Sequence, residues 1–462
     1  MSAKHDRLRM LPKVGDLLDS QQWGPLQQGY RRELVKGLLE QVLDEQRREI
    51  LDGGEGMVDS GNLLQLVTAA LESLVDIGPR PVLNATGVIL HTNLGRAPLA
   101  GAARQAALAT AGYCNLEIDL AQGVRGSRHD HVEELLCRLT GAQAAMVVNN
   151  NAAGVMLALC AVAGGGEAVI SRGQLVEIGG SFRVPDVMAQ SGVILREVGT
   201  TNKTYIDDYR QAISENTTAL VRVHPSNFRV VGFQHEVELA QMVDLAHSHE
   251  LPLIDDLGSG TMVDLSQWGI DEPTVQESVA TGADLVCFSG DKLLGGPQCG
   301  VVVGGKKWIE KLKGHPLARV LRCDKLTLAS LAATLALYMK PDGWKEVPVL
   351  AMLTEPLEQV EQRARQLATA LSNLPLPVTV EESHSPVGGG ALPLHQLETR
   401  VVSIDSGRQT EKLAAELRKQ RPPLIARIQE DRLLLDVRTL AETEIQEAAR
   451  TVAAAVEVLS GE

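Results

Sequence analysis

A lysine directly after an apolar run is the residue of this sequence whose setting best suits chemistry. Lys292 follows the run ADLVCFS (283–289) and stands between Gly290 and the pair Gly295-Gly296. Glycines at such a point indicate close backbone packing at the end of a strand, where a lysine can be desolvated. Desolvation beside other cations lowers the pKa of an amine and leaves it partly neutral, as a Schiff-base nucleophile requires. A plain loop lysine in a tight turn is the alternative.

A cluster of asparagines follows another apolar run. AAMVV (144–148) leads into Asn149, Asn150 and Asn151, and a helical pattern starts at Ala152. The free N–H groups and the positive dipole at the start of a helix bind anions, so this turn predicts a phosphate site. A simple asparagine cap without a ligand is the alternative.

Two further apolar runs end in polar residues. LPLID (251–255) is followed by Asp256, a carboxylate that can pair with a protonated ring nitrogen. Asp255 is the second choice, because side chains alternate along a strand and only one of the two aspartates faces the site. The run ALVRVH (219–224) ends another strand, and one of His224, Ser226 and Asn227 at its end could hydrogen-bond a phenolic oxygen on the same ring. The predicted site also includes Ser289, which lies before Lys292.

The order of these features along the chain is informative. A phosphate turn, an asparagine-containing strand end, an aspartate strand end and then a lysine is the order in aspartate-aminotransferase-like, fold type I enzymes. We therefore predict an α/β fold of this type with pyridoxal 5'-phosphate as its cofactor.

The elements around these residues alternate between strand and helix patterns from Val82 onward, which indicates a mostly parallel sheet covered on both faces. The run CGVVVGG (299–305) follows Lys292 after a turn too short for a helix, so we expect that strand to be antiparallel. The predicted strands are AAMVV (144–148), EAVIS (167–171), VILREV (193–198), ALVRVH (219–224), LPLID (251–255), ADLVCFS (283–289) and CGVVVGG (299–305).

The chain of 462 residues is long enough for several domains. Apolar residues at helical spacing predict a helical module over 1–77, ended by a Gly-Pro pair. A large cofactor domain is expected over 78–338. After the stretch MKPDGWKEVP (339–348), which we expect to be a linker, strands and helices predict a small α+β domain over 339–462.

The apolar runs and the spacing of cysteine and histidine argue against a membrane span and a metal site. The longest apolar run (152–163) is shorter than the roughly 18 residues of a membrane span, and we expect a cytoplasmic protein. The six cysteines include no Cys-x-x-Cys pair, and His129 and His131 have no third metal ligand at a recognisable spacing, so we predict no metal site.

The charge is distributed unevenly. The net charge is −14, which opposes a polyanionic partner, yet residues 1–48 contain nine Lys and Arg against seven Asp and Glu. A basic contact face near the N-terminus is therefore a hypothesis, with a solvated helix surface as the alternative.

Several longer motifs are distributed along the chain: GVILHTNLGRAPL (87–99), VVNNNAAGVMLAL (147–159), SRGQLVEIGGSFRVPDVM (171–188), EVGTTNKT (197–204), DLGSG (256–260), FSGDKLLGGPQCG (288–300) and HPLARVLRCDKLTL (315–328). With these motifs the sequence resembles the bacterial selenocysteine synthases, the L-seryl-tRNA(Sec) selenium transferases, over essentially the whole chain. One departure from that family is Cys299, which stands where alanine is expected.

This resemblance implies a pyridoxal-phosphate enzyme that takes seryl-tRNA(Sec), eliminates water to an aminoacrylyl group and adds selenium from selenophosphate. It also implies a homo-oligomer, a ring-like homodecamer, with sites at subunit interfaces. Arg96, Arg319 and Arg322 lie in matching motifs and are candidates for selenophosphate binding, with surface or subunit salt bridges as the alternative. Thr200 and Thr201 are expected to line the same cleft, or to form a structural turn.

Two other functions remain open from sequence. The first is a pyridoxal-phosphate lyase or ammonia-lyase acting on a small amino-sugar or amino-acid phosphate, which would have no need for residues 1–75. The second is a non-catalytic tRNA-binding scaffold, which would have no need for Lys292.

Overall fold

The computed structural model of the chain describes residues 2–54, 56, 59–75, 78–177, 183–226, 228, 230–388, 390–393 and 395–460. It divides into two compact units, Met1–Pro81 and Val82–Glu462. In the described part of the chain, no helix combines the length and the apolar character that a membrane span requires.

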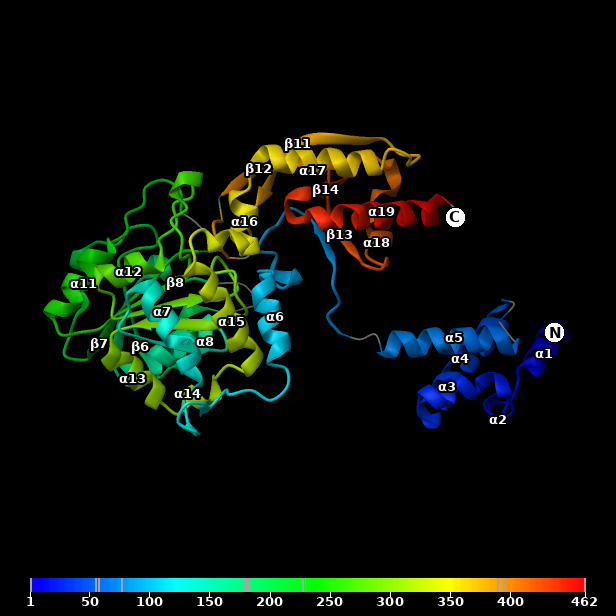
Figure 1. Cartoon of the computed structure of the whole chain (residues 1–462), viewed down its shortest axis with the longest axis horizontal. Helices are drawn as coiled ribbons and strands as arrows, with labels where there is room; N and C mark the ends of the chain where they lie inside the picture. Colours follow the sequence, from blue (N-terminus) through cyan, green and yellow to red (C-terminus); the bar gives the residue numbers. More distant parts are fainter. Residues whose placement is uncertain are drawn as a thin grey trace. The chain divides into compact units, whose positions relative to one another are not determined.

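The first unit is helical (blue in Figure 1). In its longest helix, apolar residues at three- and four-residue spacing, such as Val35 and Leu39, form the buried face, and the helix ends where Gly53 takes a left-handed φ of 100°. The apolar spacing in the sequence indicated helices in this part of the chain, and the structure contains them. The helices are α1 (Ser2–Met10), α2 (Val14–Leu18), α3 (Gly24–Gly29), α4 (Arg32–Asp52) and α5 (Ser60–Val75).

A sheet in which seven described strands pair forms the centre of the second unit, in the order β4-β10-β9-β8-β7-β5-β6. All pairs are parallel except those of β10, which runs antiparallel to both β4 and β9. The predicted sheet with one reversed strand is confirmed. The strands are β4 (Ala144–Val148), β5 (Glu167–Ser171), β6 (Ile194–Val198), β7 (Thr217–Val223), β8 (Leu253–Gly258), β9 (Leu285–Ser289) and β10 (Gly300–Gly304).

Helices cover both faces of this sheet (Figure 1). Alternate residues of β10 join different buried clusters: Val302 packs with α8, whereas Val301 and Val303 pack with α7 and α12. Two-sided burial explains the nearly continuous apolar runs of the strands. The helices are α6 (Gly101–Ala109), α7 (Glu133–Thr140), α8 (Asn151–Ala158), α9 (Val184–Gln190), α10 (Ile206–Ala212), α11 (Leu239–Ser248), α12 (Val275–Thr281), α13 (Lys306–Gly314), α14 (Leu317–Val320) and α15 (Lys325–Tyr338).

A second sheet, of five strands among the described residues, has the order β1-β13-β14-β12-β11. Residues 83–85, which fall within the range expected for the large domain, pair with β13 in this sheet instead. The elements are β1 (Leu83–Ala85), β11 (Val378–Pro386), β12 (Gln396–Ile404), β13 (Leu424–Gln429), β14 (Arg432–Asp436), α17 (Leu357–Ala370), α18 (Thr410–Leu417) and α19 (Ile445–Ser460).

The stretch 339–348 is packed and is not the linker expected from sequence. It contains the short helix η7 (Gly343–Glu346) and leads into α16 (Pro348–Thr354). Val347 is fully buried, and Trp344 packs edge to face on Trp268 with 5.6 Å between ring centroids. Burial of these apolar side chains outweighs the local preference of the Pro and Gly residues for an open turn.

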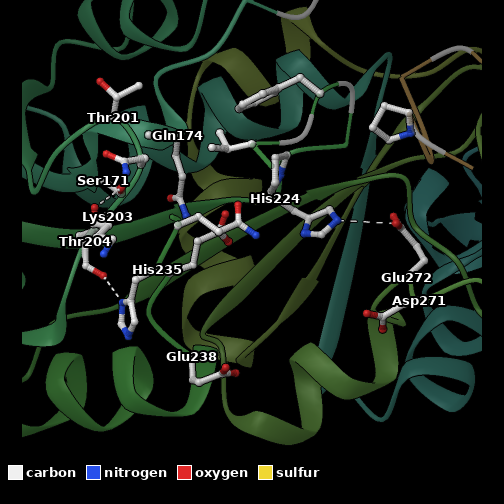
Figure 2. A pocket seen from close by; sticks show the side chains of 18 of the residues that line it. Ser171, Gln174, Thr201, Lys203, Thr204, His224, His235, Glu238, Asp271 and Glu272 are labelled. Atoms are coloured by element: carbon white, nitrogen blue, oxygen red, sulfur yellow. Dashed lines mark hydrogen bonds and ion pairs between the residues drawn. The ribbon is translucent and has the colours of Figure 1, made fainter. Parts of the chain in front are cut away.

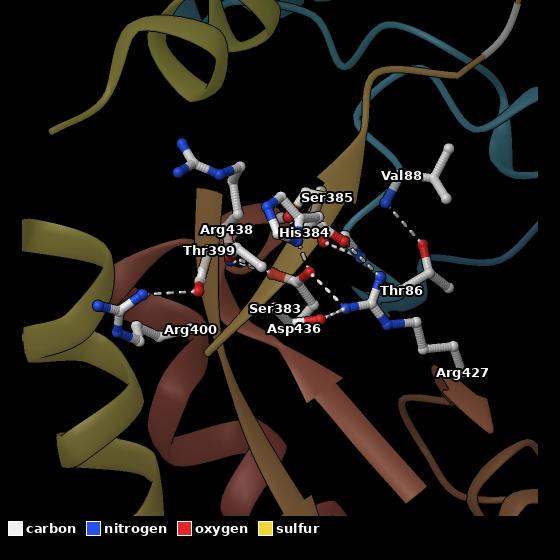
Figure 3. Close-up of polar contacts among 12 residues, drawn as sticks. Thr86, Val88, Ser383, His384, Ser385, Thr399, Arg400, Arg427, Asp436 and Arg438 are labelled. Atoms are coloured by element: carbon white, nitrogen blue, oxygen red, sulfur yellow. Dashed lines mark hydrogen bonds and ion pairs between the residues drawn. The ribbon is translucent and has the colours of Figure 1, made fainter. Parts of the chain in front are cut away.

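A buried carboxylate fixes the chain segment that leads from β1 toward the large sheet (Figure 3). Asp436 accepts hydrogen bonds from Ser385 Oγ and Thr399 Oγ1, each at 2.8 Å, and Arg427 lies 3.4 Å away. Gly87 packs so closely here, at a φ of 79°, that a Cβ would lie 2.1 Å from the Asp436 carboxylate. Only glycine fits this position, so the path of the following residues is fixed.

Candidate active site

Lys292 lies in the turn directly after β9 and is 5% exposed. Its Nζ donates a hydrogen bond to the carbonyl oxygen of Gly390 at 3.1 Å. Burial, together with the positive charge of Arg96, lowers the pKa of Lys292, although nearby carboxylates act in the opposite direction. The desolvated lysine predicted from its glycine-rich surroundings is therefore present.

The two aspartates at the end of β8 have different surroundings. Asp256 Oδ1 accepts a hydrogen bond from Asn151 Nδ2 at 2.8 Å, and the charge of Lys292 acts on this carboxylate. Burial raises the pKa of Asp256 to about 6. Asp255 instead forms an ion pair with Arg222 at 2.9 Å. The alternation of side chains along β8 thus places Asp256, and not Asp255, beside the start of α8.

The start of α8 follows β4 at the same sheet edge. Asn150 is the N-cap, and its side-chain oxygen accepts from the N–H of Ala153 at 2.9 Å, which is the cap named above as the alternative to a phosphate site. Asn151 and Ala152 form the first helical turn. Because β4, β7, β8 and β9 point the same way, this helix start and the polar residues after the other strands meet at one edge.

The residues between these groups fit a polar cofactor. Within the described chain, Asn151 Oδ1 is buried without a hydrogen-bond partner. Gly258 has a φ of 69°, and a Cβ there would lie 3.0 Å from Ser226 Oγ and 4.0 Å from Lys292 Nζ. Ser226 and Ser289 are both buried, at the ends of β7 and β9. The predicted residue Asn227 lies outside the described residues.

The three candidate arginines have different positions. Arg96 is next to the lysine, because its Nη1 donates to Asp291 Oδ2 at 2.9 Å. Arg322 pairs through its backbone with Val148, at the end of the strand that leads into α8. Arg319 is exposed on α14. Asp291 was not predicted, although its position directly before the lysine could have suggested it.

A cavity of about 600 Å³ lies at the ends of β5 and β7, where Ser171 and His224 line it (Figure 2). Thr200 and Thr201 line it, and Thr200 also closes a turn by donating its N–H to the Lys203 carbonyl at 2.8 Å. Glu272 and Leu392 line it too. Both were missed, because they lie in loops that carry no local sequence signal.

Other residues singled out in the sequence have structural surroundings. His131 Nε2 hydrogen-bonds with the Leu116 carbonyl at 3.1 Å. Burial lowers the pKa of His129 to about 4. Cys299 is buried, and burial raises the pKa of its thiol.

Around Lys292, polar residues follow the strands in the order found in pyridoxal-phosphate enzymes of fold type I. The protein belongs to this class. Residues 82–441 match the family model described as L-seryl-tRNA selenium transferase. The chain belongs to this family.

Curated relatives agree over nearly the full length. The L-seryl-tRNA(Sec) selenium transferase of Carboxydothermus hydrogenoformans is 49% identical over 95% of this chain and 95% of its own. The enzyme of the same name from Moorella thermoacetica is 48% identical over 97% of each chain. The predicted family, enzyme class and cofactor are confirmed: the chain is a pyridoxal-phosphate-dependent transferase that converts L-seryl-tRNA(Sec) to L-selenocysteinyl-tRNA(Sec).

Among solved structures, D-glucosaminate-6-phosphate ammonia-lyase aligns with a TM-score of 0.59 over 84% of this chain and 98% of its own, at 23% identity. At that identity the similarity concerns the fold alone. The ammonia-lyase alternative therefore gains no support from it.

Proposed function

We propose that selenium transfer takes place at the end of β9, where Lys292 binds the aldehyde carbon of pyridoxal phosphate and, once free, moves the α-proton of the seryl group. The main support is the burial of this amine beside Arg96, which lowers its pKa. A lowered pKa increases the unprotonated fraction of the amine, and the unprotonated amine is the form that acts as a nucleophile and as a base.

The cofactor is held by groups at the same edge of the sheet. Backbone N–H groups of Asn150, Asn151 and Ala152 bind its phosphate, because they begin α8. Asp256 pairs with its ring nitrogen. The side chains that complete the site are Ser226, Asn227 and Ser289. When bound, pyridoxal phosphate supplies an electron sink for negative charge at the substrate Cα.

Arginines bind the selenium donor in this proposal. The carboxyl group of a seryl-tRNA is esterified, so no arginine is needed to hold a free carboxylate. Guanidinium groups suit tetrahedral oxyanions, which makes Arg96, Arg319 and Arg322 candidates for selenophosphate. Thr200 and Thr201 line the cavity of about 600 Å³ and contact the aminoacyl end of the substrate.

The helical unit reads the tRNA. Residues 1–48 carry an excess of positive charge over negative charge, whereas the rest of the chain is strongly acidic. Contacts from this unit to the tRNA phosphates would bind a polyanion that the negative net charge of the rest of the chain repels. An aminoacylated tRNA as substrate supports a cytoplasmic location for the enzyme.

The chain assembles with copies of itself, as a homodecamer. Exposed apolar side chains support self-association, since surfaces of this kind mark protein interfaces. Leu108, Tyr113 and Leu120, between α6 and the hairpin of β2 (Ile118–Asp119) and β3 (Val124–Arg125), are all more than 70% exposed. The number of ten subunits is the expectation from the family resemblance.

The proposal is tested by the aminoacyl product. Purified protein is incubated with selenophosphate and either seryl-tRNA(Sec) or seryl-tRNA(Ser), and the amino acid released from the tRNA is identified by mass spectrometry. Selenocysteine is expected from tRNA(Sec) and not from tRNA(Ser).

A lysine variant locates the reaction. Lys292→Ala is expected to abolish both selenocysteine formation and the retention of cofactor after borohydride reduction. The matched variant Lys306→Ala, at the exposed start of α13, is expected to keep both. Retention of both properties by Lys292→Ala would show that the site is elsewhere.

A further inference from the structure

Elimination of water from a seryl group needs two proton movements. The α-proton must leave Cα, and a proton must reach the β-oxygen, because hydroxide is a poor leaving group near pH 7. Lys292 accounts for the α-proton in the function proposed above. The structure contains a second proton-bearing group at the same sheet edge.

His224 is the first residue after β7. Its backbone N–H donates to the carbonyl oxygen of Asp256 at 2.8 Å, which ties it to the strand end that faces the start of α8. Its side chain lines the cavity of about 600 Å³. One ring nitrogen, Nε2, lies 3.6 Å from Glu272 Oε2 (Figure 2).

Glu272 is held firmly on the far side of the ring. Its side chain is 4% exposed, and its Oε1 accepts a hydrogen bond from the fully buried Ser259 hydroxyl. The charge of Glu272 also acts on Lys292. Ser259 and Glu272 therefore place a carboxylate beside Nε2 of the imidazole, as a carboxylate orients a catalytic histidine.

Neighbouring carboxyl groups are poorer proton donors. The carboxylate of Asp291 already forms an ion pair with Arg96 at 2.9 Å. Asp256 accepts hydrogen bonds from Asn151 and from the N–H of Gly258, and the proposed function assigns it to the cofactor ring. A histidine is the side chain whose ordinary pKa allows it to give and regain a proton near pH 7.

We propose that His224 is a catalytic acid that donates a proton to the β-oxygen of the seryl group, with Glu272 as its positioning residue. The inference rests on the proposed function, because it requires the reaction to occur beside Lys292. As the Cβ–O bond breaks, its electron pair passes to oxygen, which takes the proton from the imidazolium and leaves as water. The Cα–H pair becomes the Cα=Cβ bond while Lys292 takes the α-proton, and His224 regains its proton from solvent.

The test changes the leaving group. Holoenzyme is given seryl-tRNA(Sec) or β-chloroalanyl-tRNA(Sec), and formation of selenocysteine from each is timed. Chloride leaves without a proton, so the chloro substrate has no need of the acid. His224→Gln is expected to slow the reaction of the seryl substrate by about 100-fold or more and that of the chloro substrate by no more than about threefold. Glu272→Gln, which keeps the imidazole, is expected to slow the seryl substrate by about tenfold.

Further measurements separate this role from a structural one. Retention of cofactor after borohydride reduction and the affinity for seryl-tRNA(Sec) are expected to be unchanged in His224→Gln. Exchange of the seryl α-hydrogen with D₂O is expected to continue, because Lys292 is intact. His247→Gln is the matched control, since His247 also pairs with a carboxylate, that of Asp284 at 3.0 Å, on α11 outside the cavity. It is expected to behave as wild type with both substrates.

Each contrary outcome has a definite meaning. Equal slowing of the two substrates by His224→Gln, or loss of its cofactor, would overturn the catalytic role and leave a structural one. A wild-type rate with the seryl substrate would overturn the role as well. Absence of selenocysteine from the wild-type enzyme with either substrate would instead overturn the proposed function, and this inference with it.

Discussion

Adjacent residues of one strand have separable functions when their side chains point to opposite sides of a sheet. Asp255 is fully buried in an ion pair with Arg222, whereas Asp256 lies beside Asn151. Asp255→Asn is therefore expected to lower the free energy of unfolding by about 3 kcal/mol, because it leaves Arg222 without its carboxylate. Asp256→Asn is expected to leave stability near that of wild type and to slow selenocysteine formation by about 100-fold or more.

Urea unfolding and the product assay, applied to both aspartate variants, measure these effects. The opposite pattern, a stable but inactive Asp255→Asn beside an active Asp256→Asn, would reverse the assignment.

His129 provides a pH-dependent prediction. Burial lowers its pKa to about 4, against 6.5 for an unperturbed histidine. Between these values the unfolded chain binds a proton that the folded chain does not, so this residue makes the free energy of unfolding rise from pH 4 to pH 6.5. His129→Asn is expected to flatten that rise in a series of urea unfolding curves. The exposed His249→Gln is the control, and an unchanged slope in His129→Asn would contradict a buried neutral imidazole.

The site residues found from sequence are those that follow strands. Lys292, Asp256 and Asn151 were predictable because apolar runs end where parallel strands end, and the ends of parallel strands meet at one edge. Glu272 and Gly390 were not predictable, because they reach the site through loops whose folded paths depend on tertiary contacts.

At the scale of elements, a local apolar pattern again decides which elements could be predicted from sequence. The strands of the large sheet are buried on both faces and so appear as long apolar runs. β1 has only three residues and draws its partner, β13, from more than 300 residues away, so no local pattern indicates it. The prediction of a linker at 339–348 was wrong because Trp344 and Val347 pack against distant helices and loops.

The contact between β10 and the start of α8 leads to a prediction. A Cβ on Gly300 would lie 2.1 Å from the carbonyl oxygen of Asn150, so an alanine must displace the N-cap of α8. Gly300→Ala is expected to weaken the binding of pyridoxal phosphate at least tenfold, since the displaced turn supplies the phosphate contacts in the proposed site. Titration of the cofactor-free protein, followed by absorbance, measures the affinity.

Gly305→Ala is the matched control for Gly300→Ala. Gly305 is the N-cap of α13 with a φ of −66°, and a Cβ there would lie 3.3 Å from the Trp308 side chain and 3.9 Å from the nearest backbone atom, so it displaces no backbone. Its cofactor affinity is expected to match that of wild type. Equal affinities in the two variants would show that the phosphate is bound elsewhere.

At the scale of the whole molecule, the two units have separate buried cores. The apolar cluster that contains Trp23 lies wholly within the first unit, and the other clusters lie wholly within the second. A truncated chain that keeps the second unit intact must start at Val82, because the N–H of Leu83 donates to the Pro423 carbonyl at 2.8 Å. A chain of residues 82–462 is therefore expected to fold and to bind pyridoxal phosphate, as circular dichroism and absorbance would show.

The same truncation is expected to lose tRNA binding, because the remaining unit is acidic. In the full chain, affinity for tRNA(Sec) is expected to fall steeply with salt, with a slope of about −0.7 to −0.9 in log affinity per neutralised phosphate. The sequence contains few aromatic residues for base stacking, so the shape and backbone of the tRNA must supply the selectivity.

Charge reversal tests which unit makes the phosphate contacts. The double variant Arg31→Glu and Arg48→Glu, both exposed in the first unit, is expected to weaken tRNA binding at least tenfold and to reduce the salt slope by about 1 to 2. The pair Lys412→Glu and Arg418→Glu makes the same change in net charge on the exposed surface at α18. If attraction depended on net charge alone, the two double variants would weaken binding equally. A loss of tRNA affinity confined to the first pair would instead place the phosphate contacts in the helical unit. Full affinity in the truncated chain would place those contacts in residues 82–462.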